Sequence, residues 1–186
     1  MRKLIAFNQV SLDGYFVDAG GDMSWAHRDD PEWNAFASEN ANGGGELVFG
    51  RITYEMMARF WPTPQAMQMM PAVAEGMNRS PKIVFSRTLG EASWNNTRLV
   101  KGDIAARMRE LKEETGPGMA ILGSGSIVSQ LAQPGLIDEY QLVINPIVLG
   151  GGRTMFEGVK EKLRLKLANT RTFKNGNVLL HYEAGA

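Results

Sequence analysis

The chain has 186 residues, of which 44% are hydrophobic and 22% charged, so we expect one globular domain over residues 1–186. Twenty basic residues balance twenty acidic ones, which disfavours a nucleic-acid-binding surface. Cysteine is absent and histidine occurs twice, which excludes disulfides, thiolate sites and thiol nucleophiles and predicts no metal site.

Hydropathy indicates a protein that works away from membranes. No run approaches the ~18 apolar residues of a spanning helix. The basic start, residues 1–9, carries too short an apolar run for a signal peptide. We therefore expect a cytoplasmic protein with no membrane partner.

The first half of the chain reads as alternating strands and helices. An apolar opening strand, residues 2–10, ends in turn residues 11–14, and a loop rich in Gly and Asp follows up to Asp30. Asp30-Pro31 is typical of a helix start, with Asp as the N-cap and Pro at the first helical position. That helix ends before residue 42; we then predict a strand (46–49), helices (53–60 and 65–77) and a strand (82–86).

The second half becomes richer in strands. We predict strands at 97–100, 119–122 and 137–144, helices from Asp103 to 115 and at 127–132, and a final hairpin of 163–173 with 178–182. Residues 174–177, Lys-Asn-Gly-Asn, are its turn. This order predicts an α/β fold whose mixed, mainly parallel central sheet has flanking helices and an antiparallel C-terminal hairpin.

Methionine is concentrated in one region. Five of the eleven methionines fall between Met56 and Met70. At helical spacing such residues fill a core or a subunit interface more often than they contact a cofactor. We expect the packing role here.

The most informative motif is Gly123-Ser124-Gly125-Ser126, which joins a buried strand to a helix. Free N–H groups and the dipole at such a helix start suit a phosphate, although a tight turn without a ligand has the same pattern. The motif is no Rossmann fingerprint, because its third glycine would fall at Val128. It is no Walker loop either, because no Gly-Lys-Ser/Thr follows, and it lacks the flanking glycines of a serine hydrolase elbow.

Five segments in order resemble one known family. They are residues 11–14 (Ser-Leu-Asp-Gly), 48–55 (Val-Phe-Gly-Arg-Ile-Thr-Tyr-Glu), 83–87 (Ile-Val-Phe-Ser-Arg), 123–126, and 145–156 with its Gly-Gly-Gly run. This series is similar to the dihydrofolate-reductase-like fold family. It most closely resembles the reductase domain of the bifunctional riboflavin-biosynthesis deaminase-reductase and that domain's stand-alone relatives.

The resemblance implies that NADPH lies across the carboxyl edge of the sheet. Gly50, Arg51 and Thr53 would meet its phosphates, and Ser86 and Arg87 its adenosine end. The pyrophosphate would lie against the loop and helix start formed by Gly123, Ser124, Gly125, Ser126, Ile127 and Val128. Hydroxyl, guanidinium and backbone N–H groups are all anion partners. Arg51 as a solvated helix residue and Ser86 as a turn residue remain open alternatives.

Three residues are candidates for the substrate side. Asp13 follows the first strand, Trp25 resembles a tryptophan of the reductases, and Asp30 with Trp33 resembles the acid-x-x-Trp of pterin-binding helices. A turn role for Asp13 and an N-cap role for Asp30 are the alternatives.

The resemblance implies an NADPH-dependent reductase of a pterin- or ribosylaminouracil-like heterocycle, riboflavin-biosynthesis type, and a homodimer. A true dihydrofolate reductase and a nucleotide-binding module without turnover remain alternatives. No zinc-ligand spacing of a deaminase domain is present, so any riboflavin role would be that of a separate reductase.

Overall fold

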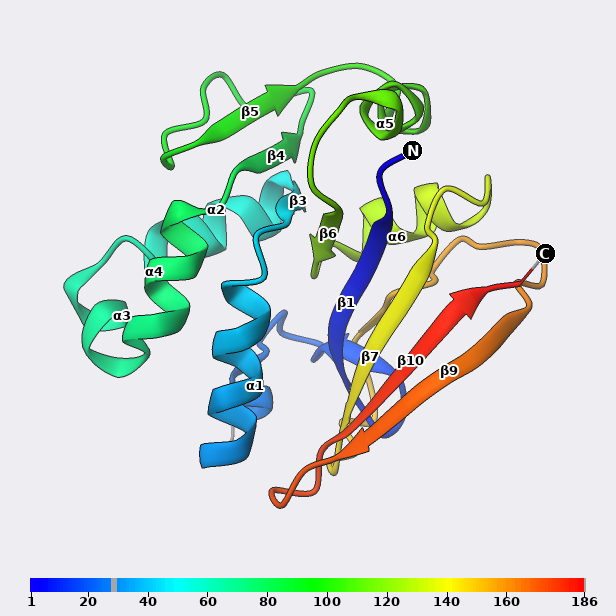
Figure 1. The fold of residues 1–186 in the computed structure, drawn as a ribbon. Helices are drawn as coiled ribbons and strands as arrows, with labels where there is room; N and C mark the ends of the chain where they lie inside the picture. Colours follow the sequence, from blue (N-terminus) through cyan, green and yellow to red (C-terminus); the bar gives the residue numbers. More distant parts are fainter. Residues whose placement is uncertain (28–29, 186) are drawn as a thin grey trace.

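The computed structural model describes residues 1–27 and 30–185 and has an eight-stranded sheet at its centre. The strand order is β5-β4-β3-β6-β1-β7-β10-β9 (Figure 1). Neighbours from β5 to β7 pair in parallel, and the β7-β10 and β10-β9 pairs are antiparallel, which confirms the predicted fold class. The strands are β1 (Leu4–Ser11), β3 (Glu46–Gly50), β4 (Lys82–Phe85), β5 (Thr97–Val100), β6 (Met119–Leu122), β7 (Glu139–Asn145), β9 (Leu165–Thr172) and β10 (Val178–Ala184).

A second, two-stranded sheet joins segments far apart in the sequence. β2 (Tyr15–Val17) pairs antiparallel with β8 (Arg153–Thr154). The sequence did not predict either strand, because each is two or three residues long and gains its order from the other. Gly152 makes the pairing possible, since a Cβ there would lie 2.0 Å from the Val17 carbonyl oxygen.

The helices begin largely where local chemistry predicts. Side chains of Asp30, Thr63 and Asp103 accept the N-cap hydrogen bonds of α1, α3 and α5. The predicted helix 65–77 is instead two helices, because Pro71 cannot continue the first one and begins the second. The helices are η1 (Ser24–Ala26), α1 (Pro31–Ala41), α2 (Arg51–Phe60), α3 (Pro64–Met69), α4 (Pro71–Arg79), α5 (Ile104–Glu113) and α6 (Gly125–Ala132).

Helices cover both faces of the parallel strands, so successive strand residues enter different cores. Val48 packs with residues of α5 and α6, whereas Leu47 and Phe49 pack with residues of α2 and α4. The helix α1 lies on the same face as α4 and packs through Trp33 and Phe36 (Figure 1). Burial on both faces explains the near-continuous apolar character of these strands.

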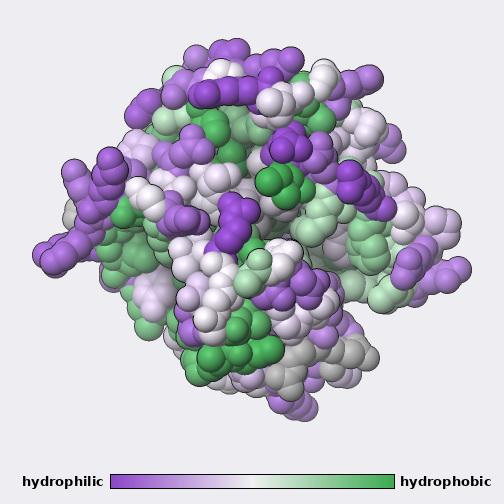
Figure 2. All heavy atoms as spheres, turned by 180° about the vertical axis from the view of Figure 1, so that it is seen from behind, coloured by the Kyte–Doolittle hydropathy of each residue, from purple (hydrophilic) through white to green (hydrophobic). Residues whose placement is uncertain are grey.

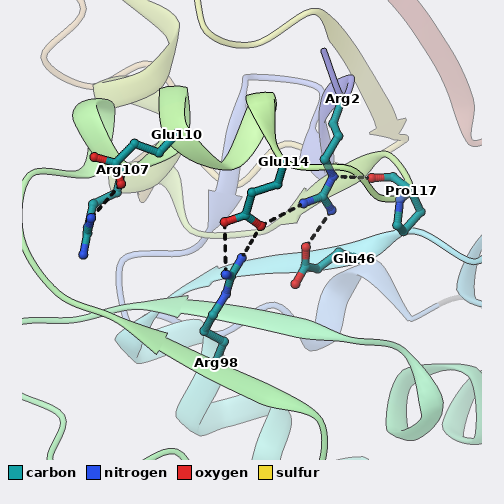
Figure 3. A network of polar contacts seen from close by, with 7 residues as sticks. All are labelled: Arg2, Glu46, Arg98, Arg107, Glu110, Glu114 and Pro117. Carbon is teal, nitrogen blue, oxygen red and sulfur yellow. Dashed lines mark hydrogen bonds and ion pairs between the residues drawn. The ribbon is translucent and has the colours of Figure 1, made fainter.

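The amino ends of the strands carry an ion-pair network. Arg2, which is 7% exposed, donates to Glu46 Oε2 at 2.6 Å and to the Pro117 carbonyl oxygen at 2.6 Å (Figure 3). The hydrogen bond from the Arg98 guanidinium lowers the pKa of the neighbouring Glu114 carboxyl. The network anchors the starts of β1, β3 and β6, at the end of the sheet opposite residues 123–126, the glycine loop.

Exposed apolar side chains are scattered. On the face that Figure 2 shows, hydrophobic residues form separate patches among hydrophilic ones. Across residues 1–27 and 30–185, the structure has no helix with the length and apolar character needed to cross a membrane.

Candidate functional site

Two helices begin side by side at the carboxyl edge of the sheet. The neighbouring strands β3 and β6 lead directly into α2 and α6. Ser124 connects the two starts, because its Oγ accepts a buried hydrogen bond from the Gly50 N–H at 2.8 Å. Ser124 adopts a left-handed conformation (φ 57°) and the preceding Gly123 has φ 60°, so this turn is sharp.

Neither helix start has a side-chain cap. Gly50, which has no side chain, precedes α2, and Ser124, whose hydroxyl accepts no capping hydrogen bond, precedes α6. Within the described part of the chain, the N–H groups of Gly125 and Ser126 have no hydrogen-bond acceptor. Two uncapped helix N-termini with free N–H groups at one edge are an arrangement whose dipoles and donors suit an anion.

Close packing surrounds the backbone of the glycine loop. A Cβ at Gly125 would lie 2.7 Å from the ring of Phe16 and 3.3 Å from the Thr154 carbonyl oxygen. A Cβ at Gly123 would lie 3.1 Å from Thr53 Cγ2. The β2-β8 sheet thus packs directly against the start of α6, and only glycine allows this approach.

A cavity of about 560 Å³ opens beside the loop, within the usual range of small-molecule sites. Its floor is the sheet face that carries alternate residues of β1, and α1, α2 and α4 form its walls. Gly50, Arg51, Thr53 and residues 123–126 line one end. Aromatic side chains and methionines line the rest, among them Phe7, Trp33, Met56, Met57, Trp61, Met70 and Met77.

The methionine-rich segment takes the expected packing role in part. Met57 packs against the buried cluster of Leu47 and Phe49 and also lines the cavity, together with Met56 and Met70. Met56, Met67 and Met69 are exposed (42%, 44% and 64%). The flexible thioether suits a wall that adapts to a ligand.

Two arginines lie beside the loop. Arg51 is the first residue of α2 and pairs with Glu55 one turn later, at 3.0 Å. A cation at a helix N-terminus is unfavourable with respect to the helix dipole, and the Glu55 carboxylate offsets this for Arg51. Arg153, which the sequence did not single out, lines the same cavity 5.8 Å from the centroid of the Phe16 ring.

The remaining expected cofactor contacts fall into two groups. Ser86 and Arg87 follow β4 outside the cavity lining, and Ser86 Oγ accepts from the N–H groups of Thr88 and Leu89. The side chains of Ile127 and Val128 are buried in the core, and both N–H groups donate to the Ser124 carbonyl oxygen. The N–H groups of this helix start without an acceptor are therefore those of Gly125 and Ser126, which precede Ile127 and Val128.

The three substrate-side candidates lie outside the lining of the large cavity. Asp13 fastens the β1-β2 turn to the glycine run, since its carboxylate accepts from Ser11 Oγ and from the N–H groups of Leu149 and Gly150. These hydrogen bonds, that of Ser11 foremost, lower the pKa of Asp13 to about 2. A carboxyl group with this pKa is ionised near neutral pH and donates no proton there.

Trp25 and Asp30 lie on the segment that leads to α1. The indole of Trp25 donates to the Asp22 carbonyl oxygen and borders a smaller cavity with Asn145, Pro146 and Ile147. Asp30 caps α1 by accepting from the Trp33 N–H at 2.9 Å. Trp33, three residues later, faces the large cavity.

Sequence reasoning missed Gln9 and Gln141, which join Phe7 on the cavity floor. Polar residues at alternate positions of an otherwise apolar strand were the available signal. Within residues 1–27 and 30–185, no group of three His, Asp or Glu side chains could hold a metal ion.

The sequence model of the RibD C-terminal domain matches residues 2–179. The chain belongs to this family. Over 181 residues it is 29% identical to the uncharacterized protein YyaP of Bacillus subtilis (strain 168), covering 97% of this chain and 94% of YyaP.

Solved structures share the fold. A deaminase/5-amino-6-(5-phosphoribosylamino)uracil reductase from Thermotoga maritima has a TM-score of 0.72 at 14% identity, covering 99% of this chain and 57% of that one. A dihydrofolate reductase from Enterococcus faecalis, complexed with NADP(H), has a TM-score of 0.67 at 14% identity, covering 99% and 97%. These two structures show the shared fold, and membership in the RibD C-terminal domain family supports a function of the reductase type.

Proposed function

We propose that residues 1–186 form a single NADPH-dependent reductase domain that reduces a pterin- or ribosylaminouracil-like heterocycle. The observation that carries the proposal is the pair of uncapped helix starts, joined by Ser124 and flanked by Arg51 at the mouth of an apolar cavity. Membership in the RibD C-terminal domain family and the NADP(H)-bound neighbour support the choice of cofactor.

The residues at this edge fit a dinucleotide. The N–H groups of Gly125 and Ser126, with the close-packed Gly123 and Ser124, would hold the pyrophosphate. Gly50, Arg51 and Thr53 would meet phosphate from the start of α2. Ser86 and Arg87 would meet the adenosine end at the carboxyl end of β4, which adjoins β3.

Bound NADPH supplies a hydride, and the acceptor also takes up one proton, so that a C=N or C=O group becomes CH–NH or CH–OH. The chain's own work is then to orient the acceptor and exclude water. Met23, Ala26 and His27, on the segment that holds Trp25, cover the cavity. Asp13 would position the turn before that segment through its bonds to the glycine run, and Asp30 would fix Trp33 by capping α1.

Arg51→Ala tests the cofactor site. A hydrogen bond to a charged group contributes about 1.5–3 kcal/mol, so NADPH affinity should fall about 10- to 100-fold in a fluorescence titration. NADH affinity is unchanged if Arg51 binds the 2′-phosphate and falls equally if it binds the pyrophosphate. Arg59→Ala, exposed on the same helix and outside the cavity lining, is the matched control. Unchanged NADPH affinity in Arg51→Ala would contradict the placement.

Turnover assays separate the alternative functions. Consumption of NADPH with dihydrofolate, blocked by an antifolate, would favour a true dihydrofolate reductase. Tight NADPH binding without turnover on any heterocycle would favour a nucleotide-binding module.

We also propose a homodimer. The edge strand β9 is mostly exposed, and its Leu167 is 50% exposed, so β9 offers unpaired backbone and apolar surface to a second copy. Light scattering at micromolar concentration should give twice the chain mass of 20.5 kDa; a single monomeric species would refute the proposal.

A further inference from the structure

We infer that the end of the cavity away from the glycine loop takes an uncharged, flat ring system with a lactam-type edge and no phosphate group. The inference rests on the proposed function, because it assigns the glycine-loop end to the nucleotide and leaves the rest to the acceptor. It narrows the proposed heterocycles to those without a phosphoribosyl group.

The floor of the cavity is long and mostly apolar. It includes Gln9, Phe7 and Ile5 of β1, the half-buried residues of that strand, together with Leu47 and Ala120. At about 3.3 Å per residue, the four-residue step from Gln9 to Ile5 covers about 13 Å along the strand. The cavity therefore extends well inside the sheet edge, far enough to bury a fused-ring system.

The wall formed by α1 is rigid and aromatic. Trp33 is 6% exposed, and its ring lies 5.2 Å from Phe173 in an edge-on arrangement and 5.4 Å from Phe36. The Arg171 guanidinium lies over the Phe173 ring, 4.8 Å from its centroid. A tryptophan held in this way offers a fixed flat surface, which favours a flat ligand.

Besides Trp33, helices α2 and α4 and the turn before α4 supply adaptable apolar side chains to the cavity. Met57, Met70 and Met77 line the cavity there, with Val73 and Trp61. Methionine packs against rings of different outline with little strain. The substrate end combines one fixed flat wall with one that adapts.

The polar groups on the floor are neutral amides. Gln141 lies beside Phe7 in the β1-β7 register. Among the described residues its side chain has no hydrogen-bond partner, and Gln9 is bonded only through its Oε1, by Asn145 at 3.5 Å. A primary amide offers a donor and an acceptor side by side, which match the C=O and N–H of a lactam.

The charges are concentrated at the other end. Arg51 begins α2, and Arg153 lies over Phe16, whose ring packs against Gly125. Among the described residues no Lys, Asp or Glu lines the cavity, although His27 does. A phosphate placed between Trp33 and the methionines would lose its hydration, and among the described residues no Lys or Arg lines that part of the cavity.

Three probes test the inference by ligand-observed NMR titration, without turnover. They are 2-quinolone (flat, with a lactam edge), quinoline (flat, without one) and uridine monophosphate (a ribosyl pyrimidine with a phosphate). We expect 2-quinolone to bind at least about tenfold tighter than either of the others. The inference is overturned if uridine monophosphate binds tightest or if 2-quinolone does not bind detectably. This comparison uses the unmodified protein alone.

Gln141→Leu removes the amide at nearly constant size. The affinity for 2-quinolone should fall about tenfold, because two hydrogen bonds are lost, whereas the affinity for quinoline should change by less than about twofold. Gln68→Leu, exposed and outside the cavity lining, is the matched control. Equal 2-quinolone affinities in the two variants would overturn the role of Gln141.

NADPH titration of the same samples separates the two hypotheses. If NADPH binds and uridine monophosphate outcompetes 2-quinolone, the inference fails and the proposed function stands. If 2-quinolone binds through Gln141 and NADPH does not bind, the proposed function fails and the ring site stands without a reductive role.

Discussion

Replacing Ser124 tests whether one buried hydrogen bond holds the two helix starts together. Ser124 is 6% exposed, and its Oγ is the acceptor for the Gly50 N–H. Ser124→Ala leaves that N–H without a partner in the interior, which costs about 1–3 kcal/mol. For a chain of this length, about 2 kcal/mol corresponds to a Tm lower by about 4–8 °C.

Ser124→Gly separates the hydrogen bond from the backbone strain. It loses the same hydrogen bond but relieves the left-handed conformation, which costs a non-glycine residue about 1–2 kcal/mol. Part of that gain is offset by the greater freedom of glycine in the unfolded chain. We therefore expect Ser124→Gly to be about 1 kcal/mol more stable than Ser124→Ala.

Guanidinium unfolding followed by circular dichroism measures these differences. Ser129→Ala is the control, since Ser129 lies one turn further along α6 and its hydroxyl bonds only to the Ser126 carbonyl oxygen. If both Ser124 variants unfold like the control, the hydrogen bond does not stabilise the turn. NADPH affinity should fall in the alanine variant if the two helix starts bind phosphate jointly.

Three further substitutions test other parts of the structure. Because the pKa of Asp13 is lowered to about 2, ionised Asp13 stabilises the folded protein fully above pH 4, and this contribution is lost as the pH falls towards 2. Asp13→Asn should therefore make the free energy of unfolding less dependent on pH between 4 and 2. Parallel pH dependences of the variant and the parent protein would contradict this. Burial lowers the pKa of Lys82 to about 8, so its contribution to the free energy of unfolding rises between pH 8 and 10.5. Lys82→Met should remove that rise when unfolding by urea is measured across this pH range. The same dependence on pH in the variant and the parent protein would refute the prediction. Glu46→Gln weakens the hydrogen bond to the buried Arg2 and should lower the free energy of unfolding by about 1.5–3 kcal/mol. A loss below about 0.5 kcal/mol would show that the hydrogen bond to the Pro117 carbonyl oxygen is enough to hold the Arg2 guanidinium.

Much of the local structure could be predicted because its causes are local. Asp30-Pro31 and Asp103 mark helix starts, because each Asp carboxylate accepts a hydrogen bond from the backbone N–H three residues later. The Asn-Gly turn of residues 174–177 fixes the final hairpin. The glycine loop could be proposed as a phosphate site because a buried strand, small residues and a helix follow in direct succession.

The sequence by itself determined the parallel sheet with its antiparallel end. Apolar strands, turn residues and the alternation of strands with helices can each be recognised from a few neighbouring positions. Only the tertiary structure decided what lies at the site. Arg153 reaches it because β8 pairs with β2, over 130 residues away, and Asp13 bonds to the glycine run for the same reason. The cavity lining combines alternate residues of β1 with side chains of three helices, and long-range packing brings such residues together with no signal at any single position.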